Sequence, residues 1–136
     1  MKVFITRLIP DRGVNLLKEK GYKVVINSED RVLAKEELIT ELKKDRYDAV
    51  LCLLTDKIDA DVLDAAGPQC KIFANYAAGF DNIDVASANE RGIMITNTPG
   101  VLTDAVAEHT FALMLAIAHR ISESDRGGMV AGHGRW

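Results

Sequence analysis

Short β-rich runs alternate with helical segments through most of the sequence, and this alternation restricts the fold more than any other feature. The expected strands are residues 2–6, 22–26, 47–54, 70–75 and 93–97. Residues 47–54 are almost entirely apolar, as a strand covered on both faces requires. Strands that alternate with helices form a parallel sheet with helices on both faces. The pattern therefore predicts a doubly wound α/β fold with a flavodoxin-like, five-stranded parallel sheet.

Boundary residues mark the helices between these strands. Pro10 fits the first position of a helix, and Gly21 fits its end. Asp59 and Asp84 are candidate N-caps for two short helices, each of which is followed by a glycine. The loops that follow the strands lie at the carboxyl edge of such a sheet, where ligands bind.

Residues 101–136 do not continue the alternation. Thr103 is a candidate N-cap, and apolar residues then repeat at spacings of three and four up to Ile121. The apolar face is so wide that two sides of this helix must be buried, whereas one small sheet covers only one. We therefore expect a domain of residues 1–100 and a long interface helix in 101–136. Residues 122–136 contain four glycines and little periodicity, which favours a linker or a chain end.

Composition and charge exclude several function classes. The 136 residues are 48% hydrophobic and 27% charged, which is typical of a folded domain. The net charge of −3 argues against a nucleic-acid partner. The longest apolar run is too short to cross a membrane, and the first residues do not resemble a signal peptide. Cys52 and Cys70 fit no zinc or redox spacing, so we expect buried reduced thiols and a cytoplasmic location.

The segment NYAAGFDNID, residues 75–84, is the most informative candidate site. It follows the fourth predicted strand, and Ala77, Ala78 and Gly79 carry little or no side chain. Their main-chain N–H groups can therefore approach an anion such as a carboxylate or a phosphate. A plain tight turn before a capped helix has the same residues. Local chemistry alone leaves both interpretations open.

The other motifs give weaker evidence for a functional site than residues 75–84 do. The helix start at Thr103 offers free N–H donors that suit an anion, although a capped helix without a ligand is the simpler interpretation. His109 and His119 show no metal-ligand spacing and no partner acid, so we expect neither a metal site nor a catalytic base there. No strand is followed by G-x-G-x-x-G, and the loop after the first strand lacks the hydroxyl- and glycine-rich sequence of a flavin-phosphate site.

Residues 75–110, NYAAGFDNIDVASANERGIMITNTPGVLTDAVAEHT, resemble the D-isomer-specific 2-hydroxyacid dehydrogenases, most of all the glyoxylate/hydroxypyruvate reductase branch. The resemblance implies an oxidoreductase that reduces a 2-oxoacid to a D-2-hydroxyacid with NAD(H) or NADP(H). It implies that the main-chain amides of Ala78 and Gly79 hold the substrate carboxylate and that Leu53 lines the same pocket. It also implies that Thr103 lies near the cofactor.

The same resemblance implies a role for each part of the chain. Residues 1–100 correspond to the flavodoxin-like substrate-binding domain. Residues 101–136 correspond to a long interdomain helix and the start of the NAD(P)-binding domain, and the helix at 103–121 resembles one that forms a homodimer interface. The family's catalytic Arg, Glu and His, and its dinucleotide fingerprint, lie beyond residue 136. We therefore expect an N-terminal portion of such an enzyme, with no catalytic residue, no tight cofactor binding and no activity alone. A stand-alone, non-catalytic carboxylate-binding or dimerisation module of the same fold is the alternative.

Overall fold

The computed structural model of the protein describes residues 1–131 and divides into two compact units, one ending at Pro99 and the other beginning at Gly100. The first unit contains β1 (Lys2–Ile5), α1 (Asp11–Glu19), β2 (Lys23–Ile26), α2 (Lys35–Lys43), β3 (Ala49–Leu53), α3 (Ala60–Ala66), β4 (Ile72–Tyr76), α4 (Val85–Glu90) and β5 (Met94–Thr96). The second contains α5 (Thr103–Ala118) and α6 (Ile121–Ala131).

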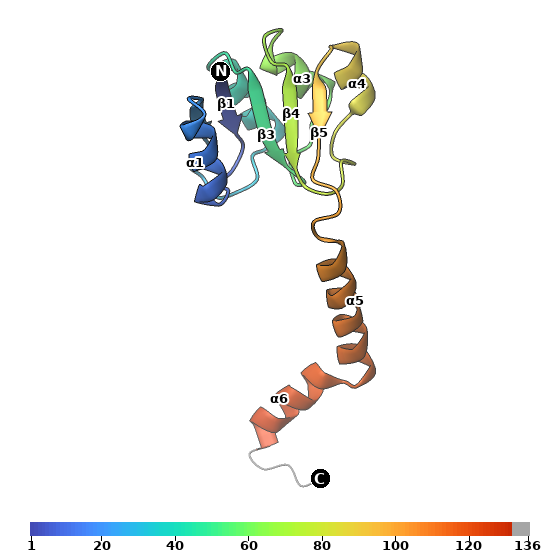
Figure 1. Ribbon diagram of the computed structural model, residues 1–136. Helices are drawn as coiled ribbons and strands as arrows, with labels where there is room; N and C mark the ends of the chain where they lie inside the picture. Colours follow the sequence, from blue (N-terminus) through green and yellow to red (C-terminus); the bar gives the residue numbers. More distant parts are fainter. Residues whose placement is uncertain (132–136) are drawn as a thin grey trace. The chain divides into compact units, whose positions relative to one another are not determined.

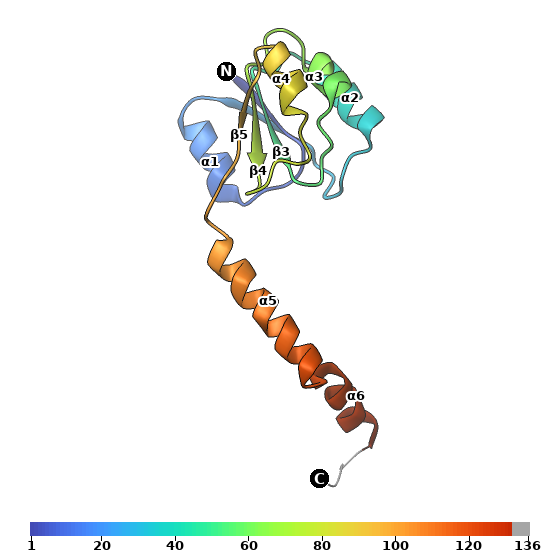
Figure 2. The same ribbon diagram turned by 90° about the vertical axis from the view of Figure 1, so that its right-hand side faces the viewer.

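The first unit is a parallel sheet of five strands in the order β2-β1-β3-β4-β5 (Figure 1). This order confirms the predicted flavodoxin-like, doubly wound fold. Helix α1 lies on one face of the sheet, and α2, α3 and α4 lie on the other (Figure 2). The strand order reverses direction between β1 and β3, and a switch point of this kind opens ligand crevices at the carboxyl ends of the strands.

Alternation along the strands sends side chains to two separate cores. In β1, Val3 and Ile5 face α1 and pack with Val14, whereas Phe4 faces the other helices. The larger core, on that side, includes Val50 and Phe73, which are fully buried. Because both faces of the central strands are covered, their apolar runs are continuous, as the sequence indicated.

Side-chain caps fix the starts of the two short helices as predicted. The Asp59 carboxylate accepts a hydrogen bond from the Val62 N–H at 3.3 Å, and the Asp84 carboxylate accepts one from the Ser87 N–H at 2.9 Å. Pro10 differs from the expectation, because it is the N-cap of α1 and not its first helical residue. Its φ of −53° suits either position, but its ψ of 135° is extended and keeps it outside the helix.

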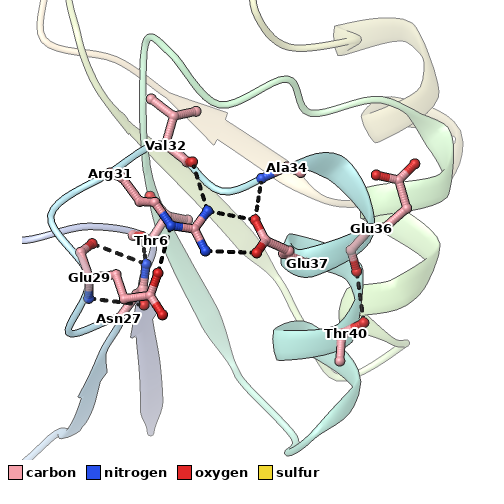
Figure 3. Close-up of polar contacts among 9 residues, drawn as sticks. All are labelled: Thr6, Asn27, Glu29, Arg31, Val32, Ala34, Glu36, Glu37 and Thr40. Carbon is pink, nitrogen blue, oxygen red and sulfur yellow. Dashed lines mark hydrogen bonds and ion pairs between the residues drawn. The ribbon is translucent and has the colours of Figure 1, made fainter.

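The loop between β2 and α2 is fastened to the helix by charge (Figure 3). The Arg31 guanidinium donates two hydrogen bonds to the Glu37 carboxylate, each of 2.7 Å. The same carboxylate accepts from the Ala34 N–H at 2.8 Å, which satisfies a free donor at the helix start. The backbone of this loop is therefore tied to the first turn of α2.

The second unit corrects three expectations. Leu102, not Thr103, is the N-cap of α5, and no side chain caps this helix. Helix α6 occupies residues that the sequence suggested as a linker, while residues 132–136 of that expected linker lie outside the described residues. The predicted helix 103–121 is interrupted, because Arg120 adopts a φ of 53°, a left-handed conformation that ends a right-handed helix.

Both cysteines are buried and unbridged, in agreement with the sequence interpretation. Burial raises the pKa of the Cys52 thiol to about 12, so it stays protonated at neutral pH. Among the helices formed by residues 1–131, none has both the length and the apolarity that crossing a bilayer requires.

Candidate functional site

The candidate site is the bend of residues 77–80, which leaves β4 at the carboxyl edge of the sheet (Figure 1). Ala77 is still buried, whereas Ala78, Gly79 and Phe80 are exposed. A Cβ atom built on Gly79 would have no atom within 4 Å, so the space in front of this residue is open. The bend therefore presents bare main chain to solvent where ligands of this fold bind.

Main-chain donors on this bend are unpaired within the described part of the chain. No hydrogen bond joins the N–H of Ala78 or Gly79 to another residue among 1–131. Successive main-chain N–H groups in a turn can bind an anion when they face the same way. The exposure of these residues agrees with the sequence, and anion binding at this bend stays a prediction.

The carbonyl groups of the bend, by contrast, are all engaged. The Ala77 carbonyl accepts from the Thr98 N–H at 2.9 Å, and the Ala78 carbonyl accepts from Asn97 Nδ2 at 2.7 Å. The Gly79 carbonyl accepts from Asn75 Nδ2 at 2.9 Å. Sequence reasoning missed both asparagines, because a side-chain amide carries no charge and no motif marks it.

A further asparagine, Asn82, joins the bend to the end of β3. Asn82 Nδ2 donates to the Leu53 carbonyl at 3.1 Å and to the Asp56 carbonyl at 2.9 Å. Asp56 is only 4% exposed and accepts from Thr6 Oγ1 at 2.5 Å and from the Leu53 N–H at 2.8 Å. The ends of β1, β3 and β4 are thus held in one network of buried polar groups.

A small cavity of about 170 Å³ lies beside the bend, lined by Phe80, Val85, Ile95 and Asn97. Two of these residues contact the bend or belong to it. Leu53 is half-buried at the end of β3 and does not line this cavity, although its main chain belongs to the network around Asn82. Thr103 is the first residue of α5 and belongs to the second unit.

The described residues were also compared with the groups that hold a metal ion or a dinucleotide in other proteins. Within residues 1–131, no three His, Cys, Asp or Glu side chains gather closely enough to hold a metal ion. The turns after β1, β3 and β4 contain no G-x-G-x-x-G, so these residues do not fit a dinucleotide. What the bend offers is a set of exposed main-chain N–H groups that have no acceptor among residues 1–131.

Comparison with known proteins gives the chain its family. The model of the D-isomer specific 2-hydroxyacid dehydrogenase catalytic domain matches residues 3–126. The chain is 52% identical over 125 residues to the glyoxylate reductase of Thermofilum pendens, a match that covers 92% of this chain and 36% of that protein.

Solved structures agree with this match. A protein of Thermus thermophilus superposes with a TM-score of 0.89 at 36% identity, over 100% of this chain and 42% of that one. A Polaromonas protein, described as an NAD-binding D-isomer specific 2-hydroxyacid dehydrogenase, gives 0.86 at 29% identity, over 99% of this chain and 41% of that one. The chain thus spans well under half the length of these relatives. It belongs to the family of D-isomer-specific 2-hydroxyacid dehydrogenases.

Proposed function

We propose that the protein forms the substrate-binding part of an oxidoreductase that reduces a 2-oxoacid, glyoxylate, hydroxypyruvate or a similar compound, to a D-2-hydroxyacid. One observation carries the proposal: unpaired N–H groups of Ala78 and Gly79 at the carboxyl edge of the sheet, in a chain that matches this family over residues 3–126. Charge-assisted hydrogen bonds from such donors fit the carboxylate that all 2-oxoacids share.

The proposed role of these residues is to bind and orient. Holding the carboxylate fixes the keto carbon relative to the groups that react with it, which lowers the entropic part of the barrier. Leu53, at the end of β3, would line the same pocket. We assign no residue of this chain to hydride or proton transfer. The electron donor in this proposal is NAD(H) or NADP(H), in keeping with the NAD-binding Polaromonas relative, with Thr103 near it.

The second unit has a proposed role of its own. Large apolar side chains of α5 are more than half exposed, namely Val106, Phe111, Leu113, Met114, Leu115 and Ile117. Apolar surface on this scale marks an interaction site. We assign residues 103–121 to a homodimer interface and 101–136 to the connection with an NAD(P)-binding domain, with residues 1–100 as the substrate domain. The buried, reduced thiols of Cys52 and Cys70 support a cytoplasmic location.

A chimera tests the enzymatic role directly. Residues 3–126 of this chain replace the matching segment of the Thermofilum pendens glyoxylate reductase. We expect the chimera to reduce glyoxylate, measured by the loss of nicotinamide absorbance. The 136-residue chain alone is expected to give no turnover with NADH or NADPH. An inactive chimera that is correctly folded would favour the non-catalytic module instead.

Gly79 supplies the site-specific arm of this test. In the chimera, Gly79→Asp places a carboxylate in front of the donors, and like-charge repulsion of about 2.7 kcal/mol should raise KM for glyoxylate by about 100-fold. Gly79→Ala is the matched control, since a Cβ there meets only open space, and it should change KM far less. An unchanged KM in the aspartate variant would remove this bend from the site.

A further inference from the structure

The bend of residues 77–80 has three successive carbonyls that are each held by a donor from the protein side. The donors are the Thr98 N–H, Asn97 Nδ2 and Asn75 Nδ2, at 2.9, 2.7 and 2.9 Å. The described chain contains no cis peptide bond, so the C=O and N–H of each planar unit point in opposite directions. Fixing a carbonyl therefore fixes the direction of the next residue's N–H.

For the three peptide units of the bend, this geometry gives three N–H donors, each of which points away from the group that holds the carbonyl of the same unit. The N–H of Ala78 points away from Thr98, and the N–H of Gly79 points away from Asn97. The third unit runs from the Gly79 carbonyl to the Phe80 N–H, which points away from Asn75. Like its two predecessors, the Phe80 N–H meets no acceptor within residues 1–131.

The Asn75 side chain fixes the third peptide unit, which joins Gly79 and Phe80, and is itself held by several hydrogen bonds. It is 2% exposed, and its Nδ2 also donates to Asn82 Oδ1 at 3.0 Å. Its Oδ1 accepts from Asn82 Nδ2 at 3.4 Å and from Cys52 Sγ at 3.6 Å. With contacts at both ends of the amide, rotation about its last bond would break several hydrogen bonds at once.

We propose that Asn75 is a positioning residue, which holds the Gly79 peptide so that the Phe80 N–H becomes a third donor to the substrate carboxylate beside those of Ala78 and Gly79. The proposal rests on the function proposed above, because it names the side chain that shapes that same site. It also explains why β4 contains a buried polar side chain. An aspartate side chain has no N–H group and a leucine side chain has no donor at all, so neither side chain can hold the Gly79 carbonyl in this way.

The test uses the isotope-labelled 136-residue chain, with oxalate as the probe and amide NMR resonances as the readout. In the wild-type chain, we expect the Ala78, Gly79 and Phe80 amide signals to shift along one saturation curve. If Ala78 and Gly79 shift while Phe80 does not, the role of Asn75 is overturned and the proposed function stands. If none of the three shifts, the carboxylate site itself fails, and the proposed function fails with it.

Variants then separate positioning from mere stability. Asn75→Asp should weaken oxalate binding by about tenfold, because one directed donor is lost, and should abolish the Phe80 shift at saturation. Asn15→Asp, the same change on the exposed face of α1, should bind as the wild type does. A residue that only stabilised the fold would reduce the folded fraction and leave the Phe80 shift of the folded species intact, and that result would overturn the proposal. If Asn75→Asp does not fold, the wild-type titration decides alone.

Discussion

At the scale of single residues, uncharged side chains hold the candidate site in position. Asn75, Asn82 and Asn97 hold the bend and the end of β3 through their side-chain amides. The sequence predicted the exposed Ala78 and Gly79 main chain, since small residues after a strand are visible as a pattern. It did not predict the asparagines, because hydrogen bonds that reach 19 and 29 residues along the chain depend on how the strands are brought together.

Glu37 gives a prediction about acid stability. Hydrogen bonds from Arg31 and from the Ala34 N–H lower the pKa of Glu37 from 4.5 to about 2. A pKa that is lower in the folded state adds stability above the unfolded value, and this stability is lost as the pH falls from about 4.5 toward 2. Glu37→Gln should therefore be less stable than the wild type at neutral pH, and its urea midpoint should fall less across this acid range.

Glu36→Gln is the matched control for this measurement. Glu36 lies beside Glu37 in the first turn of α2 but is exposed. Its variant should follow the wild-type profile of midpoint against pH. Equal acid slopes in the wild type and in Glu37→Gln would show that the Arg31 pair does not govern this part of the profile.

Helix starts give a prediction at the scale of elements. The Asp84 carboxylate accepts from both the N–H and the Oγ of Ser87, at 2.9 and 2.7 Å. Asp84→Ala leaves the first-turn donors of α4 without this cap and should lower the urea midpoint of unfolding. Asp84→Asn keeps a capping oxygen and should lower the midpoint much less. Urea denaturation measures both, and equal losses would mean that charge, rather than the cap, stabilises this helix.

Element boundaries show where sequence reasoning succeeds and where it fails. The order of strands and helices and the caps at Asp59 and Asp84 were predicted, because periodicity and capping are local. The third strand was predicted to begin at residue 47, but β3 begins at Ala49, since Tyr47 is buried against Phe4 without joining the strand ladder. Burial and strand pairing leave the same apolar signal in a sequence.

The second unit escaped prediction for a different reason. Helix α6 includes two adjacent glycines, which lower helix propensity and suggest a linker. The turn at Arg120 has a positive φ in a residue that rarely adopts one, so no sequence signal marks it. Propensity is a weak guide where one backbone conformation decides whether a helix continues.

Helix α5 determines the behaviour expected of the whole molecule in solution. Its exposed apolar side chains predict that the chain self-associates, so light scattering should give the mass of a dimer at micromolar concentration. Phe111→Glu combined with Leu115→Glu, one turn apart, should shift the population toward monomer. Glu108→Lys, another charge change on α5, is the control. A sharp monomer peak for the wild-type chain would contradict the proposed interface.

Donors that belong to the backbone are retained whatever residue occupies the position. Replacement of the side chain at 78 or 80 changes the exposed surface of the bend, but both N–H groups survive every substitution except proline. Under the proposed function, a lineage built on this bend can therefore alter the length of the acid that it accepts while the main-chain donors for the acid group persist. Recognition by the main chain lets the preference among acids change during evolution while the donors for the negative charge are kept.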